Sequence, residues 1–210
     1  MAVVCPTVTP RNMAEYKEQL RKIQGFAKRI HLDFMDGHFA SPASPKLSEI
    51  FWQPGPIVDL HLMFKRPMDY IEEVAKLQPH LVIVHLEAED VLEFLHELDG
   101  LGIKRGIALL PETPPTLLDP FIELINHVLI FSGHLGHFGG KVDLNLLHKV
   151  TTIKKLKPSL EIGWDGGINI GNVKDLVAGG IDVLNTGGSI QKAEDPEDAY
   201  DKLVAAVEEE

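Results

Sequence analysis

Short runs of β-branched and apolar residues recur along the chain, and segments with helical periodicity separate them. The runs predict eight buried strands, at residues 2–8, 29–35, 57–64, 81–87, 104–110, 127–133, 159–167 and 181–188. The intervening periodicity predicts helices at residues 12–26, 66–77, 90–101, 114–125, 145–156, 172–180 and 196–209, with a shorter segment at 45–52. Strand and helix therefore alternate over the whole chain.

This alternation predicts parallel strands joined by right-handed crossovers. Eight such units in 210 residues fit one (β/α)₈ barrel, a single domain over residues 1–210. An open doubly wound sheet is the alternative. The count of eight, and the polar residues that end several strands, favour the barrel.

Polar side chains lie late in three predicted strands. The two-residue period of a strand puts His31 and Asp33 on one face, and it puts His61 and Asp165 on the corresponding faces of their own strands. The active site of a parallel barrel lies at the carboxyl ends of its strands. We therefore expect these four side chains to converge.

Two imidazoles and two carboxylates form a ligand set for one divalent metal ion, such as Zn²⁺, Fe²⁺, Mn²⁺ or Co²⁺. Each side chain could instead be satisfied separately by hydrogen bonds, as buried polar groups usually are. Four such residues at three strand ends favour the shared metal site.

Glycine pairs lie at the ends of the last three predicted strands. Gly139–Gly140 follows the sixth, and Gly166–Gly167 and Gly187–Gly188 end the seventh and eighth. Glycine lets backbone N–H groups approach an oxyanion, and barrels often hold phosphate in the loops after strands seven and eight. Tight turns also use glycine, but three pairs at successive strand ends favour a phosphorylated substrate.

The net charge of −11 argues against nucleic acid or a membrane surface as a partner, because both attract basic patches. Cys5 is the only cysteine, so no intrachain disulfide can form. The sequence has neither a signal-peptide pattern nor an 18-residue apolar run, and we expect a cytoplasmic protein.

The motifs "HLDFMDGHF", "DLHLMF", "VHLEAE", "FGGK" and "DGGIN" resemble, in this order, the ribulose-phosphate 3-epimerase family. The resemblance implies a metal-dependent barrel enzyme of the pentose phosphate pathway. Its substrates would be the phosphorylated ketoses D-ribulose 5-phosphate and D-xylulose 5-phosphate. It also implies a homo-oligomer.

Carried over position by position, the resemblance implies four metal ligands: His31, Asp33, His61 and Asp165. Asp33 and Asp165 would also form the acid/base pair. The resemblance further implies substrate contacts at Thr7, Met35, Met63 and the glycine pairs. Family members place a methionine at a third position near the reacting carbons, where this chain has Phe131 or a neighbouring residue.

Several segments depart from the family pattern. The chain reads "ASPASPKL" after "MDGHF", it reads "HLGHFGGKVD" after the sixth strand, and Gly188 stands where a serine is usual. These departures leave open a different ketose phosphate, such as D-allulose 6-phosphate. A non-catalytic sugar-phosphate-binding barrel is a further alternative. The presence of both Asp33 and Asp165, one carboxylate for each face of the sugar, argues against it. Related decarboxylase or synthase barrels typically lack the paired histidines.

Two other positions remain open at this stage. Asp36 follows the second strand, where an aspartate more often bonds nearby backbone than reacts. His85 shares a strand face with Glu87, and the pair is either a support for the metal site or a satisfied core pair.

Overall fold

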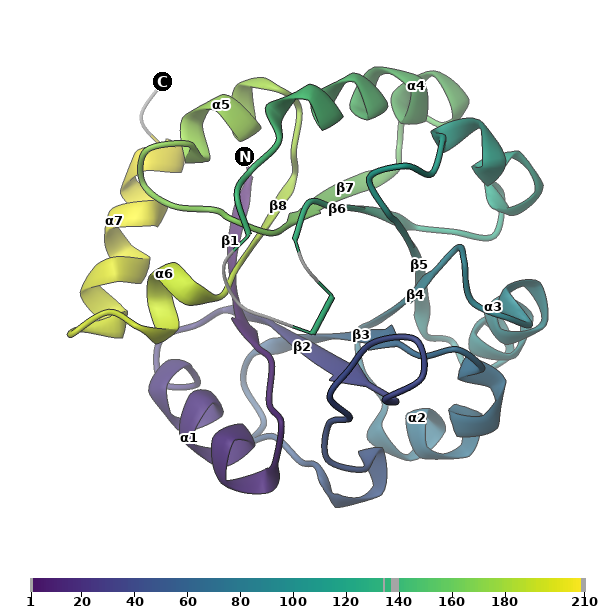
Figure 1. Ribbon diagram of the computed structural model, residues 1–210, viewed down its shortest axis with the longest axis horizontal. Helices are drawn as coiled ribbons and strands as arrows, with labels where there is room; N and C mark the ends of the chain where they lie inside the picture. Colours follow the sequence, from purple (N-terminus) through teal and green to yellow (C-terminus); the bar gives the residue numbers. More distant parts are fainter. Residues whose placement is uncertain (1, 134, 137–139, 209–210) are drawn as a thin grey trace.

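The computed structural model describes residues 2–133, 135–136 and 140–208. Its eight parallel strands close into one barrel in the order of the sequence, and the helices surround it (Figure 1). The (β/α)₈ fold is therefore confirmed. The strands are β1 (Val3–Val8), β2 (Arg29–Met35), β3 (Ile57–Met63), β4 (Leu81–His85), β5 (Lys104–Leu109), β6 (His127–Phe131), β7 (Glu161–Asp165) and β8 (Val183–Thr186).

The α-helices are α1 (Met13–Ile23), α2 (Ile71–Leu77), α3 (Val91–Gly100), α4 (His148–Leu156), α5 (Val173–Ala178), α6 (Gly188–Gln191) and α7 (Pro196–Glu208). Short 3₁₀ helices are η1 (Leu47–Glu49), η2 (Pro67–Tyr70), η3 (Pro115–Phe121) and η4 (Leu144–Leu147). No helix in the described part of the chain is long and apolar enough to cross a membrane.

The prediction of an α-helix at residues 114–125 is wrong. This segment forms only the 3₁₀ helix η3, with Pro115 near its start and Pro120 inside it. An internal proline lacks the N–H that an α-helix needs, and its ring clashes with the preceding turn. The four-residue helix α6 had no counterpart in the prediction.

The barrel has an outer and an inner set of apolar contacts. The large core lies between strands and helices and includes Phe34 and the fully buried Trp164. Inside the barrel, a small cluster joins Leu81, Ile83, Ala108 and Leu129. All seven residues of β2 are buried, so polar residues on its inward face must find partners within the barrel.

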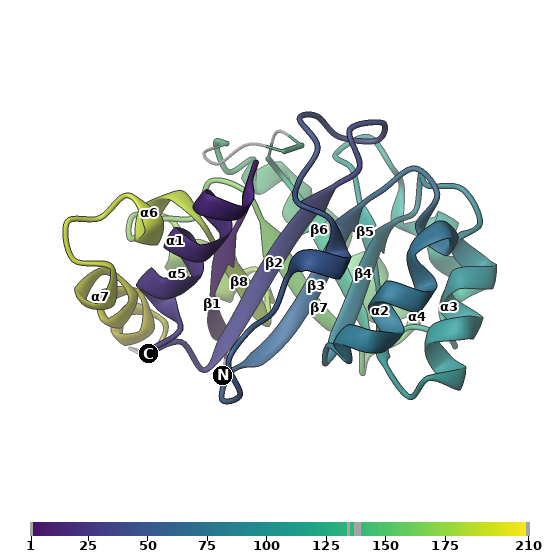
Figure 2. The same cartoon turned by 90° about the horizontal axis from the view of Figure 1, so that it is seen from below.

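Such partners close the amino-terminal end of the barrel. The Arg29 guanidinium donates to Asp59 Oδ2 at 2.6 Å and makes two bonds of 2.8 Å to the carboxylate of Glu161. The His127 ring nitrogen Nδ1 lies 2.8 Å from Glu161 Oε2. Figure 2 shows the N-terminus at this end of the strands and the loop after β2 at the other. The ionic cluster therefore lies away from the predicted site.

We expect the substitution Arg29→Met to lower the free energy of unfolding by about 3–5 kcal/mol, because it leaves the buried Asp59 carboxylate without its counter-charge. Urea denaturation at pH 7 measures the effect. The control is Lys202→Met, which removes an exposed pair with Asp198 and should cause no measurable change. An Arg29→Met protein as stable as its parent would contradict this account.

Candidate metal centre and pocket

Four buried or half-buried titratable side chains meet at the carboxyl end of the barrel. His31 and Asp33 come from β2, His61 comes from β3 and Asp165 ends β7. One ligand atom from each lies within 4.8 Å of all the others. Strand register explains the contact, since Asp33 is paired with His61 on the neighbouring strand. The predicted convergence is confirmed.

The Asp33 carboxylate is the centre of this cluster. Its Oδ1 lies 2.9 Å from His61 Nδ1 and 3.0 Å from His31 Nε2, and its Oδ2 accepts a hydrogen bond of 2.8 Å from Thr9 Oγ1. The His31 contact is not aligned as a hydrogen bond. Among the described residues, both ring nitrogens of this buried imidazole lack a hydrogen-bond partner. His31 is therefore a buried imidazole whose ring nitrogens the described residues leave without a hydrogen-bond partner.

The surroundings move the pKa values of the two carboxyl groups in opposite directions. Burial would raise the pKa of Asp33, but the charge of His31 and the close contacts of both imidazole rings outweigh it and hold this pKa well below its ordinary value. Burial raises the pKa of Asp165, and the neighbouring Asp33 carboxylate raises it further, to about 7. At pH 7 the cluster therefore holds an ionised Asp33 carboxylate and an Asp165 carboxyl group that exchanges between its protonated and ionised forms.

The His61 imidazole also suits metal binding. Burial lowers the pKa of His61 to about 4, against the opposing effect of Asp33, so this ring is neutral at pH 7. A neutral imidazole is the form that binds metals. Two imidazole nitrogens and two carboxylate oxygens are a donor set that several divalent transition metals accept. These four residues could hold one divalent metal ion.

A pocket of about 300 Å³ lies over the cluster. Its walls include Thr7, Met63, Phe131 and five residues of the predicted glycine pairs. These glycines are Gly140, Gly166, Gly167, Gly187 and Gly188. Met35 does not line the pocket and packs in a small apolar cluster with Met63. Gly139 lies outside the described residues. The pocket thus brings together the other predicted substrate-contacting positions at the mouth of the barrel.

The backbone conformation at positions 166 and 167 requires glycine. Both have positive φ, at 116° and 73°, which side chains with a Cβ rarely adopt. A Cβ at Gly167 would also lie 2.6 Å from the Val142 backbone nitrogen and 2.7 Å from the Gly140 carbonyl oxygen. The loops after β6 and β7 therefore pack against each other. Ser189, on the helix α6 after β8, donates its Oγ hydrogen to the Ile168 carbonyl oxygen at 2.5 Å and so contacts the segment after β7.

Sequence reasoning missed Thr9 and Asn185. Thr9 lies one residue beyond the end of β1 and bonds Asp33, while Asn185 lies on β8, beside Asp165. Both line the pocket, and the buried amide of Asn185 has no hydrogen-bond partner among the described residues. The rule that singles out late-strand polar residues would have found Asn185, whereas Thr9 lies beyond its strand.

Asp36 is structural, as predicted. Its Oδ1 accepts hydrogen bonds from the backbone N–H groups of His38 and Phe39, and its Oδ2 accepts one from Lys65, at 2.7–2.8 Å. The carboxylate therefore fixes the turn after β2 and attaches it to the segment after β3.

Residues 3–191 match the model of the ribulose-phosphate 3 epimerase family. The chain belongs to this family. It is therefore an isomerase of the epimerase type.

Curated relatives extend over nearly all of the chain. The cytoplasmic isoform of ribulose-phosphate 3-epimerase from Oryza sativa subsp. japonica is 27% identical, over 99% of this chain and 95% of its own. Ribulose-phosphate 3-epimerase from Helicobacter pylori is 30% identical, over 95% of both chains.

Solved structures show the same fold at lower identity. A 3-hexulose-6-phosphate synthase superposes with a TM-score of 0.72, covering 98% of this chain and 99% of its own, at 21% identity. KGPDC from Streptococcus mutans gives 0.74 at 9% identity, with 99% and 97% coverage. These two similarities concern the barrel alone.

We expect Thr9→Val to lower the free energy of unfolding of the metal-free protein by about 1–3 kcal/mol, because Oδ2 of the buried Asp33 loses its donor. Urea denaturation in the presence of a chelator measures the loss. Thr9→Ser keeps the hydroxyl and should retain most of the stability. A valine variant as stable as the serine variant would show that this hydrogen bond is unimportant.

Proposed function

We propose that this protein is a divalent-metal-dependent 3-epimerase that interconverts D-ribulose 5-phosphate and D-xylulose 5-phosphate. The observation that carries the proposal is the pair of carboxyl groups, Asp33 and Asp165, in one buried cluster beneath a glycine-lined pocket. Membership of the family supports it. In this proposal His31, Asp33, His61 and Asp165 are the metal ligands.

The two carboxyl groups reach the substrate from different parts of the barrel. Asp33 lies late in the inward row of β2, and Asp165 ends that of β7. On the shorter way around the barrel, β1 and β8 lie between these two strands. One carboxylate removes the C3 proton from one face of the sugar. The other carboxyl group gives a proton to the opposite face, so that one C–H bond breaks, another forms and the configuration at C3 inverts.

The metal supplies electrostatic stabilisation of the negative charge that develops on the sugar oxygens when the C3 proton leaves. Zn²⁺, Fe²⁺, Mn²⁺ and Co²⁺ all suit the donor set. Thr9 and His61 hold Asp33 from both sides of its carboxylate, which limits its rotation before the proton moves. Burial of the cluster keeps bulk water away from the reacting carbons.

Binding of the phosphate group depends on the loops after β6, β7 and β8. The chain carries a net charge of −11, so long-range attraction does not favour an anion. Backbone N–H groups beside Gly140, Gly166, Gly167, Gly187 and Gly188 supply the local dipoles instead. Thr7, Met35 and Met63 complete the contacts that we propose for the sugar.

The names of the relatives favour a pentulose phosphate, whereas Gly188 and the segment at 40–47 leave room for D-allulose 6-phosphate as the second candidate. The homo-oligomer and the cytoplasmic location stay predictions.

The test follows deuterium at C3 by NMR, with metal-loaded protein in D₂O and each of the two ketose phosphates. We expect the parent to incorporate deuterium and invert C3 with D-ribulose 5-phosphate. Asp33→Asn and Asp165→Asn should each lower turnover by at least about 100-fold, because each removes one proton-transfer group. A chelator should abolish turnover, and re-addition of single metals identifies those that support it.

The matched control is Asp119→Asn, which alters an exposed aspartate of η3 and should leave turnover unchanged. Incorporation with D-allulose 6-phosphate alone would change the assigned substrate. Turnover by Asp165→Asn at the parental rate would refute the two-carboxylate mechanism. Metal and ligand binding without any exchange would support the non-catalytic barrel.

A further inference from the structure

The short helix α6 brings a lysine to the wall of the pocket. It follows Gly187 directly, and Lys192 is its C-terminal capping residue. Gly188, Ser189 and Lys192 all line the pocket. In Figure 2, α6 lies closer than α7 to the end of the barrel that carries the loop after β2. Lys192 is exposed, so a molecule that enters the pocket can reach its side chain.

Lys192 is the one basic residue among the pocket-lining residues that the structure describes. The acidic ones, Asp33 and Asp165, belong to the candidate metal centre. The charges of the pocket are therefore separated, because the carboxyl groups come from β2 and β7 and the ammonium group comes from the end of the helix after β8. This separation favours one orientation for a bound molecule that carries its negative charge at one end.

The ammonium group of Lys192 makes no hydrogen bond or ion pair with the parts of the chain that the structure describes. Lys154 on α4 differs, since its Nζ bonds the carbonyl oxygen of Leu160 at 2.8 Å and the carboxylate of Asp182 at 3.1 Å. An exposed lysine without a partner adds little to the stability of the fold. The charge of Lys192 is therefore available to a ligand.

The backbone that carries Lys192 is attached to the barrel at both ends of α6. Gln191 is 5% exposed, and its Nε2 donates to the carbonyl oxygen of Thr7 on β1 at 3.0 Å. Near the other end of the helix, the hydrogen bond from Ser189 to Ile168 joins α6 to the segment after β7. The Lys192 side chain thus starts from a fixed place beside the loops after β7 and β8.

We propose that Lys192 binds the phosphate group of the substrate as an ion pair at the mouth of the pocket. The inference rests on the proposed function, in which a ketose phosphate enters this pocket, and it adds a charged side chain to the backbone N–H groups of the glycine loops. Lysine binds phosphate as a point charge. Because the reacting carbon lies at Asp33 and Asp165, the phosphate at the far end of the sugar extends toward α6. Lys192 therefore favours phosphorylated ketoses over neutral ones.

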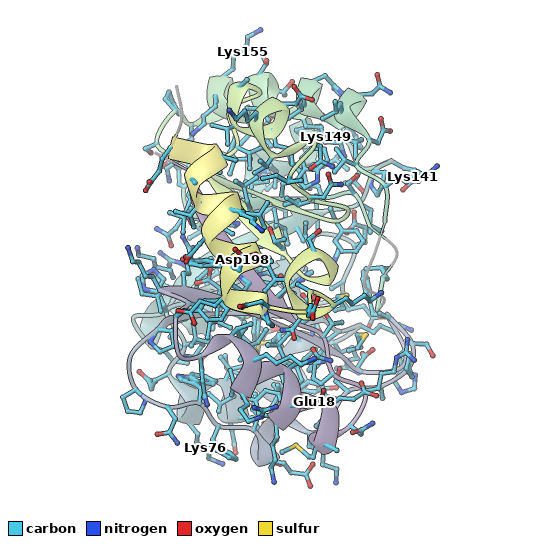
Figure 3. All side chains as sticks on the ribbon, turned by 90° about the vertical axis from the view of Figure 1, so that its left-hand side faces the viewer. Glu18, Lys76, Lys141, Lys149, Lys155 and Asp198 are labelled. Atoms are coloured by element: carbon cyan, nitrogen blue, oxygen red, sulfur yellow. The ribbon has the colours of Figure 1, made fainter. Side chains whose placement is uncertain are left out.

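The kinetics of Lys192→Met test this ion pair. We expect its KM for D-ribulose 5-phosphate to rise by about 10- to 100-fold with little change in kcat, because the phosphate is bound equally in the ground state and the transition state. Lys192→Arg keeps the charge and should retain most of the affinity. The matched control is Lys155→Met, since Figure 3 shows Lys155 on α4 pointing away from the body of the molecule. This control should keep the parental KM.

Inorganic phosphate tests the same contact without substrate and without metal. It is titrated into the chelator-treated protein at constant ionic strength, and binding is followed by phosphorus NMR. We expect Lys192→Met to bind phosphate at least about 10-fold more weakly than the parent, and Lys155→Met to bind it equally well. Thermal unfolding should give the parent and Lys192→Met the same midpoint, because the exposed lysine has no partner to lose.

The outcomes separate the role of Lys192 from the proposed function. A parent that epimerises neither D-ribulose 5-phosphate nor D-allulose 6-phosphate would refute the proposed function. An active parent, with a Lys192→Met protein of parental KM and parental phosphate affinity, would overturn the role of Lys192 and leave the proposed function standing. An equal loss of phosphate affinity in Lys155→Met would also overturn that role, because the effect would then come from net charge and not from the site.

Discussion

The negative charge of Asp33 is the constraint on which the site depends. A carboxylate that is 5% exposed at the mouth of a barrel is stable only with partners on both oxygens, and Thr9, His31 and His61 surround it. Burial raises the pKa of Asp165, and the same charge raises it further across the cluster. This buried charge therefore influences the protonation of Asp165 and favours an arrangement that suits a cation.

The two-residue period of the strands separates this site from the part of the barrel that stabilises the fold. On β2, Arg29 faces the ionic cluster at the amino end, and Asp33 lies two inward positions later, at the carboxyl end. On β7, Glu161 and Asp165 repeat this arrangement. Between them, Gly163 provides the space for a neighbour, since a Cβ there would lie 2.6 Å from His127 Nε2.

Periodicity and the polar ends of strands were sufficient to predict the barrel and the four converging side chains. They failed at residues 114–125, where prolines override the helical pattern. They also missed Thr9, because its bond to Asp33 depends on how neighbouring strands are placed in the closed barrel. The pattern left the role of His85 open for a similar reason, since the 3.0 Å contact with His61 follows from the packing of β3 beside β4.

Crystals grown with Mn²⁺, with diffraction measured near the manganese absorption edge, test the central claim most directly. The account predicts one strong anomalous peak per chain, bound by His31 Nε2, His61 Nδ1 and oxygens of Asp33 and Asp165. His61 Nε2 should remain in contact with His85. A peak at other side chains, or fully occupied Mn²⁺ that leaves any of these four residues uncoordinated, would contradict the account.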